Sequence, residues 1–243
     1  MDTILQSPAT DRLNRISGTL PRPWDAFDAY LFDVDGTLLN CKDAVHYFAF
    51  CEALKALSGR KLNLDGVTAH GNTDIGILRD ALALAGIPES FWRPNLSAAC
   101  RSMCSYVHRK RDQISTAVLP GVEAVLQHLR HRKAILGIAT GNLETIGIIK
   151  LESCGLLRYF DFQAFSDGLD HRPQVYNRAL NRAHVLAGPQ AAICAIGDTP
   201  ADVRAGRQHG ISVIAVATGI HSLEQLCAEQ PDLCLPSLSA LVP

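Results

Sequence analysis

Short apolar runs alternate with amphipathic segments along most of the chain. The run AYLFDVD at 29–35 is of the kind found in a buried strand. Four later runs, KAILGIATGN, FQAFSD, AAICAIGD and ISVIAVATG, are each separated from the next by a segment with helical spacing. Alternating strands and helices imply right-handed crossovers and a mostly parallel sheet. The pattern therefore predicts an α/β fold with a Rossmann-like, doubly wound core.

One stretch, residues 43–114, interrupts this alternation. Apolar residues recur at helical spacing across 43–58, 71–86 and 88–113, with no convincing strand between these segments. We interpret the block as an α-helical cap domain inserted after the first strand. The predicted domains are an N-terminal extension, 1–24, an α/β catalytic core, 25–42 and 115–243, and the helical cap, 43–114.

Polar side chains gather at the ends of the predicted strands. Parallel α/β sheets bind ligands beyond the carboxyl ends of their strands, so these side chains should share one edge. Clustered carboxylates repel one another, and burying them costs free energy unless a positive group compensates. The residues, in chain order, are Asp33, Asp35, Thr140, Asn142, Arg172, Asp198 and Asp202.

Several acids and an arginine at one edge indicate a hard cation and a phosphoryl group. Mg²⁺ prefers oxygen ligands and is usually held by one or two carboxylates together with substrate phosphate. Arg172 would face the phosphoryl oxygens, and Thr140 would donate a hydrogen bond to one of them. An aspartate could then attack phosphorus to form an aspartyl-phosphate. A second acid two residues along the same strand points to the same face, where it could protonate the leaving oxygen and later activate water.

Three motifs resemble the signature motifs of the haloacid dehalogenase-like superfamily and occur in the same order. The resemblance covers roughly residues 27–220, and the helical insertion after the first motif is similar to members with an α-helical cap of the first type. The nearest branches are phosphoglycolate-phosphatase-like and β-phosphoglucomutase-like. The motifs are Asp33-Val34-Asp35-Gly36-Thr37, Thr140-Gly141-Asn142 and Gly197-Asp198-Thr199-Pro200-Ala201-Asp202.

The resemblance implies a role for each motif residue. Asp33 would be the nucleophile and Asp35 the general acid and base. The Asp33 carboxylate, the Asp35 backbone carbonyl and Asp198 would ligate Mg²⁺, with Asp202 as an auxiliary acid. Thr73 lies where capped relatives often carry a specificity loop, although capping of the following helix explains it equally well. The residues expected to bind phosphate or substrate are Gly36, Thr37, Thr140, Gly141, Asn142, Arg172 and Thr73.

The third family motif differs here, because Arg172-Pro173 stands where the family usually has a lysine before a proline. A guanidinium is larger, planar and bidentate, but it can still neutralise Asp33 and a phosphate. Lys150 is an alternative to Arg172. It sits in the middle of a predicted helix, eight residues past Asn142, and is not favoured for that reason.

Some of these residues also have a purely structural interpretation. Arg172 could pair with Asp170 at the surface, and Asp202 could be a charge favoured in the first turn of a helix. Thr140 could bond the backbone at the end of its strand. The order and spacing of the motifs favour a site over these separate explanations.

The motif details favour a phosphatase that acts on small phosphorylated metabolites. Dehalogenases of the superfamily generally lack the second aspartate, and Asp35 is present. Mutases of the superfamily tend to carry an apolar residue where Thr37 stands. The alternatives are, in order, a phosphomutase, a 2-haloacid dehalogenase and a low-activity phosphate-binding regulatory protein, of which Arg172 favours the last.

The composition narrows the class of partner. The net charge is -1 and the sequence pI about 6.7, with no basic stripe to indicate nucleic acid. The apolar runs are too short to span a bilayer, and the N-terminus lacks the apolar segment of a signal peptide. Eight cysteines without framework-like spacing suggest reduced thiols and a cytoplasmic location. We therefore expect Mg²⁺ and a small phosphorylated substrate, with neither nucleic acid nor membrane, and leave the oligomeric state open.

Overall fold

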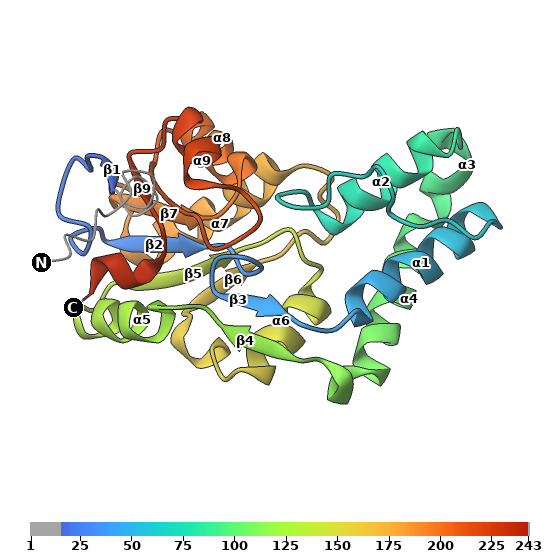
Figure 1. The fold of residues 1–243 in the computed structure, drawn as a ribbon, viewed down its shortest axis with the longest axis horizontal. Coiled ribbons are helices and arrows are strands. Elements are labelled where there is room, and N and C mark those ends of the chain that lie inside the picture. Colours follow the sequence, from blue (N-terminus) through green and yellow to red (C-terminus); the bar gives the residue numbers. More distant parts are fainter. Residues whose placement is uncertain (1–15, 243) are drawn as a thin grey trace, which may run out of the picture.

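A seven-stranded sheet forms the centre of the protein in the computed structural model, which describes residues 16–242 (Figure 1). Its strand order is β1-β9-β8-β7-β2-β5-β6, and every neighbouring pair is parallel except β1 and β9. This arrangement confirms the predicted, mostly parallel α/β fold. The strands are β1 (Ser17–Gly18), β2 (Ala29–Phe32), β5 (Ile135–Ala139), β6 (Phe162–Ala164), β7 (Ile193–Gly197), β8 (Ser212–Val216) and β9 (Leu233–Leu235).

Helices cover both faces of this sheet. Their N-termini follow the strand ends closely, as expected for crossover connections in a doubly wound fold. The core helices are α5 (Val122–His131), α6 (Glu144–Ser153), α7 (Arg172–Ala187), α8 (Pro200–Gln208) and α9 (Leu223–Ala228), with the 3-10 turns η3 (Leu157–Tyr159) and η4 (Leu238–Leu241); a further turn, η2 (Arg111–Gln113), belongs to the insertion.

The central strand, β2, explains why the sheet needs two helical layers. All four of its residues are completely buried. Tyr30 and Phe32 pack in the cluster that contains α5, whereas Ala29 and Leu31 pack in the cluster that contains α7 and α8. Successive side chains of a strand point to opposite faces, so an uninterrupted apolar run requires cover on both.

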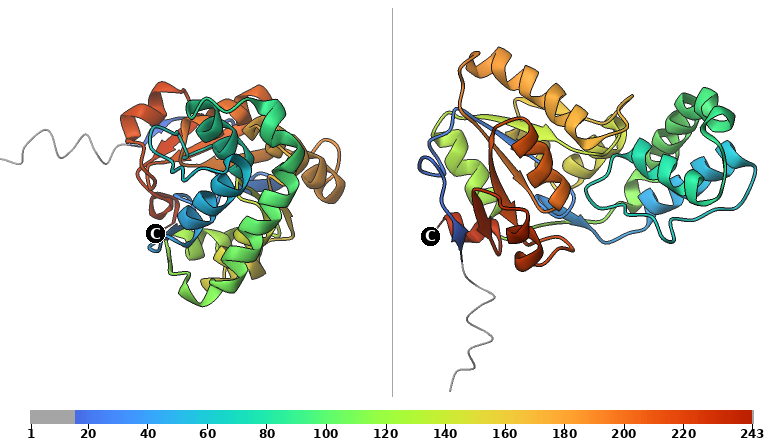
Figure 2. Two further views of the ribbon diagram at one scale, coloured as in Figure 1. Left: turned by 90° about the vertical axis from the view of Figure 1, so that its right-hand side faces the viewer. Right: turned by 90° about the horizontal axis from the view of Figure 1, so that it is seen from above.

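The helical insertion forms a second body beside the carboxyl ends of the strands (Figures 1 and 2). It has its own apolar cluster, in which Phe50, Leu54, Leu78, Trp92 and Met103 are buried. The segment expected to be one helix at 88–113 is divided, with Pro94 in the short turn between two helices. The helices are α1 (Val45–Ser58), α2 (Asp74–Leu84), α3 (Glu89–Trp92) and α4 (Leu96–Arg109), with the turn η1 (Arg93–Asn95).

Two short antiparallel strands connect the core to the insertion. β3 (Leu39–Cys41) enters the helical block and β4 (Thr116–Val118) leaves it, and they pair with each other. The paired strands flank the insertion on both sides in the sequence, and we therefore propose 43–114 as the limits of the cap. In the N-terminal extension assigned to 1–24, residues 1–15 lie outside the described part. Its described part contains β1, which adds an edge strand to the sheet.

No helix within residues 16–242 is long and apolar enough to cross a membrane.

Candidate active site

A cavity of about 500 Å³ lies between the strand ends and the cap. Asp33, Asp35 and Arg172 line it from the core. The cap contributes His46 and Phe50 from α1, together with residues around the start of α2. A site of this kind, enclosed by two bodies, can shield a bound molecule from water.

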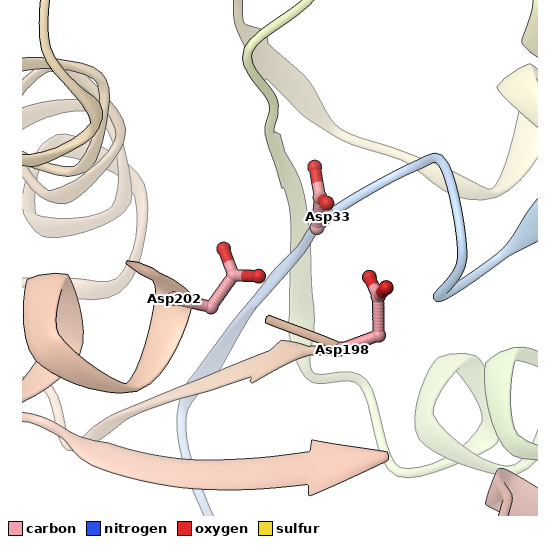
Figure 3. A group of neighbouring side chains, drawn as sticks. All are labelled: Asp33, Asp198 and Asp202. Atoms are coloured by element: carbon pink, nitrogen blue, oxygen red, sulfur yellow. The ribbon is translucent and has the colours of Figure 1, made fainter. Parts of the chain in front are cut away.

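Three carboxylates lie close together at the strand ends, and one of them, Asp33, lines the cavity (Figure 3). Asp33 directly follows β2, Asp198 directly follows β7, and Asp202 lies in the first turn of α8. One oxygen from each lies within 4.8 Å of the others, and all three side chains are buried. Because β2 and β7 are parallel neighbours, their carboxyl ends bring Asp33 and Asp198 together.

The carboxylates are held in an unfavourable electrostatic setting. Burial raises the pKa of Asp33 to about 6, against the opposing effect of the Arg172 guanidinium. Burial, and then the neighbouring charge of Asp33, raise the pKa of Asp198 well above its ordinary value. A single buried arginine therefore leaves negative charge uncompensated, which is the situation that a bound cation relieves.

Asp33 and Asp198 fit a divalent metal ion better than Asp202 does. Oδ1 of Asp198 accepts a hydrogen bond from the Thr37 hydroxyl at 2.8 Å, but Oδ2 is buried and has no hydrogen-bond partner within the described chain. A Cβ atom added to Gly36 or Gly219 would lie only 2.2 or 1.8 Å from that Oδ2, so glycine at both positions is what allows this oxygen to lie where it does. Carboxylate oxygens are the ligands that hard cations prefer.

The oxygens of Asp202 are already engaged. Its Oδ1 accepts from Arg172 Nε at 3.0 Å, from Arg172 Nη2 at 2.5 Å and from the Tyr176 hydroxyl at 3.1 Å. Its Oδ2 accepts from the backbone N–H and hydroxyl of Thr199, at 3.2 and 2.7 Å. Asp202 therefore serves as an anchor for Arg172 and as part of the capping box of α8.

Arg172 is the cation that faces the first aspartate. It is the first residue of α7, it is only 5% exposed, and its Nη2 lies 2.8 Å from Asp33 Oδ1. The alternative in which Arg172 pairs with Asp170 at the surface is wrong, because Asp170 pairs with Arg93 instead. The predicted proximity of Arg172 to Asp33 is therefore present in the structure.

A second buried cation, Lys150, lies beside Asp35. Its Nζ donates to Asp35 Oδ1 and Oδ2, at 2.9 and 2.8 Å, and to Asn142 Oδ1 at 2.8 Å. Asn142 Nδ2 in turn donates to Asp35 Oδ2 at 2.7 Å and to the Thr140 hydroxyl at 2.8 Å. Partial burial by itself raises the pKa of Asp35, but the Lys150 ammonium and the Asn142 amide together outweigh it and hold that pKa below its ordinary value.

Lys150 was not favoured from the sequence, because it lies in the middle of a helix. Side chains of a helix lean towards its N-terminus, so a long side chain on α6 can reach back to Asn142, which precedes the helix. The available signal was the composition of α6, where Lys150 stands directly between Ile149 and Leu151. A lone lysine within such an apolar run is rarely buried without a partner.

Two threonines assigned to substrate binding have their hydroxyls occupied by the protein. The Thr37 hydroxyl donates to Asp198 Oδ1. The Thr73 hydroxyl accepts from Gly76 N–H at 2.9 Å and donates to the Asp170 carbonyl at 3.0 Å. Thr73 is completely buried and caps α2, so of our two interpretations the structure has the helix cap. Gly36, Thr140, Gly141 and Asn142 do line the cavity.

Comparison with known proteins agrees with this geometry. A family model described as haloacid dehalogenase-like hydrolase matches residues 30–216. The probable phosphatase IndB of Dickeya dadantii is 29% identical over 218 residues, which cover 87% of this chain and 90% of that protein. A phosphoglycolate phosphatase of Rhodobacter capsulatus is 28% identical over 199 residues, covering 79% of this chain and 84% of that protein.

Solved structures share the same architecture. The crystal structure of a β-phosphoglucomutase from Clostridium difficile superposes with a TM-score of 0.64 at 18% identity, covering 89% of this chain and 93% of that chain. At this identity the likeness shows the fold alone. The motif residues, the family match and the inserted helices lead to one conclusion. The chain belongs to the haloacid dehalogenase-like hydrolases, and it carries a helical insertion after its first motif.

Proposed function

We propose that this haloacid dehalogenase-like phosphatase hydrolyses a small phosphorylated metabolite with Mg²⁺, by way of an aspartyl-phosphate on Asp33. The observation that carries the proposal is the buried pair of Asp33 and Asp198, whose negative charge Arg172 offsets only in part. Bound Mg²⁺ would supply the charge that lets an anionic phosphate approach an anionic nucleophile. Asp33 and Asp198 would hold it, and ligation by the Asp35 carbonyl remains a prediction.

Asp33 is proposed as the nucleophile. Its carboxylate oxygen would form a bond to phosphorus as the bond from phosphorus to the leaving oxygen breaks. Asp35, whose pKa is low in the free protein, would take up a proton as the negatively charged phosphate ester binds beside it, and would pass that proton to the leaving oxygen so that an alcohol departs. Water would then attack the aspartyl-phosphate and lose a proton to Asp35, which releases inorganic phosphate and restores both carboxyl groups.

Arg172 is proposed to stabilise the phosphoryl group during transfer. Its guanidinium is already fixed by Asp202 and lies 2.8 Å from Asp33, so it needs little rearrangement to meet developing negative charge. The Thr140 hydroxyl lines the same cavity and is proposed to donate to a phosphoryl oxygen. These contacts would bind any phosphate monoester and do not select the organic part.

The substrate class is proposed from the size and enclosure of the cavity. A volume of about 500 Å³ accommodates a small metabolite but not a macromolecule. One relative is named a phosphoglycolate phosphatase and another a pyrophosphatase. Both compounds are small enough for the cavity, and we propose them as the first candidate substrates. A cytoplasmic location is part of the proposal and rests on cysteine usage, with all eight cysteines free.

The test is phosphate release from p-nitrophenyl phosphate, measured with Mg²⁺ and with excess chelator. Turnover should require Mg²⁺ and should disappear in Asp33→Asn. The matched control is Asp112→Asn, because the Asp112 side chain is 95% exposed and lies outside the cavity. Turnover that ignores the chelator or survives in Asp33→Asn would reject the mechanism.

A further inference from the structure

We propose that Lys150 is a positioning residue that fixes the Asp35 carboxylate for proton transfer to the leaving oxygen. The inference rests on the proposed function and assigns a role to a residue outside the three motifs. Two buried cations lie in the site, and each contacts different carboxylates. Arg172 contacts Asp33 and Asp202, whereas Lys150 contacts Asp35.

The hydrogen-bonding capacity of Lys150 is fully used. An ammonium group has three protons and no acceptor. Its Nζ lies within hydrogen-bond distance of the Asp35 carboxylate, of Asn142 Oδ1 at 2.8 Å and of His46 Nδ1 at 3.1 Å. Three protons therefore meet three side chains, and none is left to bind a phosphoryl group. This distinguishes Lys150 from a substitute for the usual motif lysine.

Asn142 completes the holding arrangement. Its Oδ1 can only accept, which suits the ammonium, and its Nδ2 can only donate, which suits the carboxylate. Lys150, Asp35 and Asn142 thus form a closed ring in which every donor faces an acceptor. Lys150 and Asn142 hold the Asp35 side chain by these hydrogen bonds. The side chain remains 40% exposed and lines the cavity in which a leaving oxygen would lie.

Lys150 also joins this ring to the cap. His46 belongs to α1, and its Nε2 lies 3.3 Å from Asp74 Oδ2 at the start of α2. The side chain of Lys150 is only 3% exposed, and burying an ammonium is costly unless its partners are well placed. An apolar residue would fill the same helix position without that cost. We infer that the position carries a lysine because Asp35 needs a fixed orientation.

The experiment compares two esters that differ in their need for a proton. Phenyl phosphate has a poor leaving group, whereas dinitrophenyl phosphate has a good one that departs without protonation. In Lys150→Met, kcat/KM for phenyl phosphate should fall by at least about tenfold, since a misplaced general acid loses much of its effect. For dinitrophenyl phosphate, kcat/KM should change by less than about threefold, because that step needs no acid.

Two further variants make the assignment specific. Asp35→Asn should show the same dependence on the leaving group, and Lys150→Met combined with Asp35→Asn should be no worse than Asp35→Asn alone, because both act on one function. Lys55→Met makes the same substitution at an exposed position of α1 and should leave both rates unchanged. If Lys150→Met does not fold, Lys150→Gln takes its place, since it keeps a donor without the charge.

The outcomes separate this inference from the proposed function. An equal loss of kcat/KM for both esters would assign Lys150 to phosphoryl binding, and no loss for either would show that Asp35 does not need it. Either result overturns the positioning role while the wild-type protein still hydrolyses both esters. Failure of the wild-type protein to hydrolyse either ester would overturn the proposed function, and the positioning role with it.

Discussion

Arg93 in the cap and Asp170 in the core form a two-pronged ion pair. Nη1 of Arg93 lies 3.0 Å from Asp170 Oδ1, and Nη2 contacts Oδ2. The Asp170 carbonyl also accepts from the Thr73 hydroxyl at 3.0 Å and from Arg79 at 3.4 Å, so three cap residues bind one core residue. Asp170 is two residues before Arg172, and the position of the cap is therefore tied to the segment that carries Arg172.

Arg93→Met should loosen the cap in this position. Arg93 is 35% exposed and Asp170 21%, so solvent weakens the pair and its worth is at most about 1 kcal/mol. We expect KM for p-nitrophenyl phosphate to rise by about three- to fivefold, with a smaller change in kcat, because the cap side of the cavity becomes less ordered. Steady-state kinetics check this, with Arg111→Met as the control, since Arg111 is 60% exposed and its ion pair with Asp112, at 3.9 Å, involves a side chain that is 95% exposed. An unchanged KM would show that the pair does not hold the cap.

The stability contributed by this pair should depend on pH. The Arg93 guanidinium holds the pKa of Asp170 below its ordinary value of 3.8. A carboxyl group whose pKa is lower in the folded state stabilises the protein above the unfolded-state pKa and loses that contribution as pH falls through the folded-state pKa. The difference in unfolding free energy between wild type and Arg93→Met should be constant from neutral pH to about pH 4 and shrink below it. Urea unfolding at a series of pH values measures it. In a background of Asp170→Asn with Glu89→Gln, which neutralises both carboxylates that contact Arg93, the Arg93 substitution should have no pH-dependent effect.

Asp198→Asn should stabilise the protein in chelator and abolish its response to Mg²⁺. Burial and the charge of Asp33 disfavour the Asp198 carboxylate, so removing the charge relieves repulsion. In the wild type, Mg²⁺ at about 100 times its Kd should raise the unfolding free energy by about 2.7 kcal/mol. Thermal unfolding with Mg²⁺ and with chelator tests both statements. A wild-type-sized Mg²⁺ shift in Asp198→Asn would exclude this carboxylate as a ligand.

Gly219→Ala should weaken the response to Mg²⁺ without removing any charged group. The added Cβ would lie 1.8 Å from Asp198 Oδ2, which is too close for the carboxylate to keep its position. We expect the Mg²⁺-induced shift in melting temperature to be lost or strongly reduced. Gly155→Ala is the matched control, because Gly155 has φ +71° but no atom within 4 Å of the added Cβ. That control should lose some stability yet keep the full Mg²⁺ shift.

Arg172→Lys should retain some activity, and Arg172→Met should retain almost none. A lysine can supply one charge near Asp33 but cannot keep the forked contacts to both Asp33 and Asp202. We expect kcat to fall by about 10²-fold in Arg172→Lys, in the range observed when one donor to a developing charge is lost. Arg172→Met leaves two buried carboxylates without their partner and should cost about 3–5 kcal/mol of unfolding free energy. Equal stability and activity in the two variants would contradict this account.

The family, the parallel sheet and the helical insertion could all be predicted from the sequence. The physical reason is that these features depend on local patterns. Uninterrupted apolar runs such as AYLF require cover on both faces, and the acids after β2 and β7 follow from the rule that parallel strands end at one edge. Proximity of Asp33, Asp198 and Arg172 was predictable for the same reason.

Side-chain contacts between residues that are far apart in the sequence could not be predicted from the sequence alone. Lys150 and Asp35 are 115 residues apart and meet only in the folded protein, and Thr37 and Asp198 are 161 residues apart. The sequence determined which residues reach the sheet edge, since strand ends and turns are local properties. Only the tertiary structure decided which cation serves which carboxylate, because that choice depends on side-chain reach, burial and competition for hydrogen bonds among groups that the chain brings together from far apart.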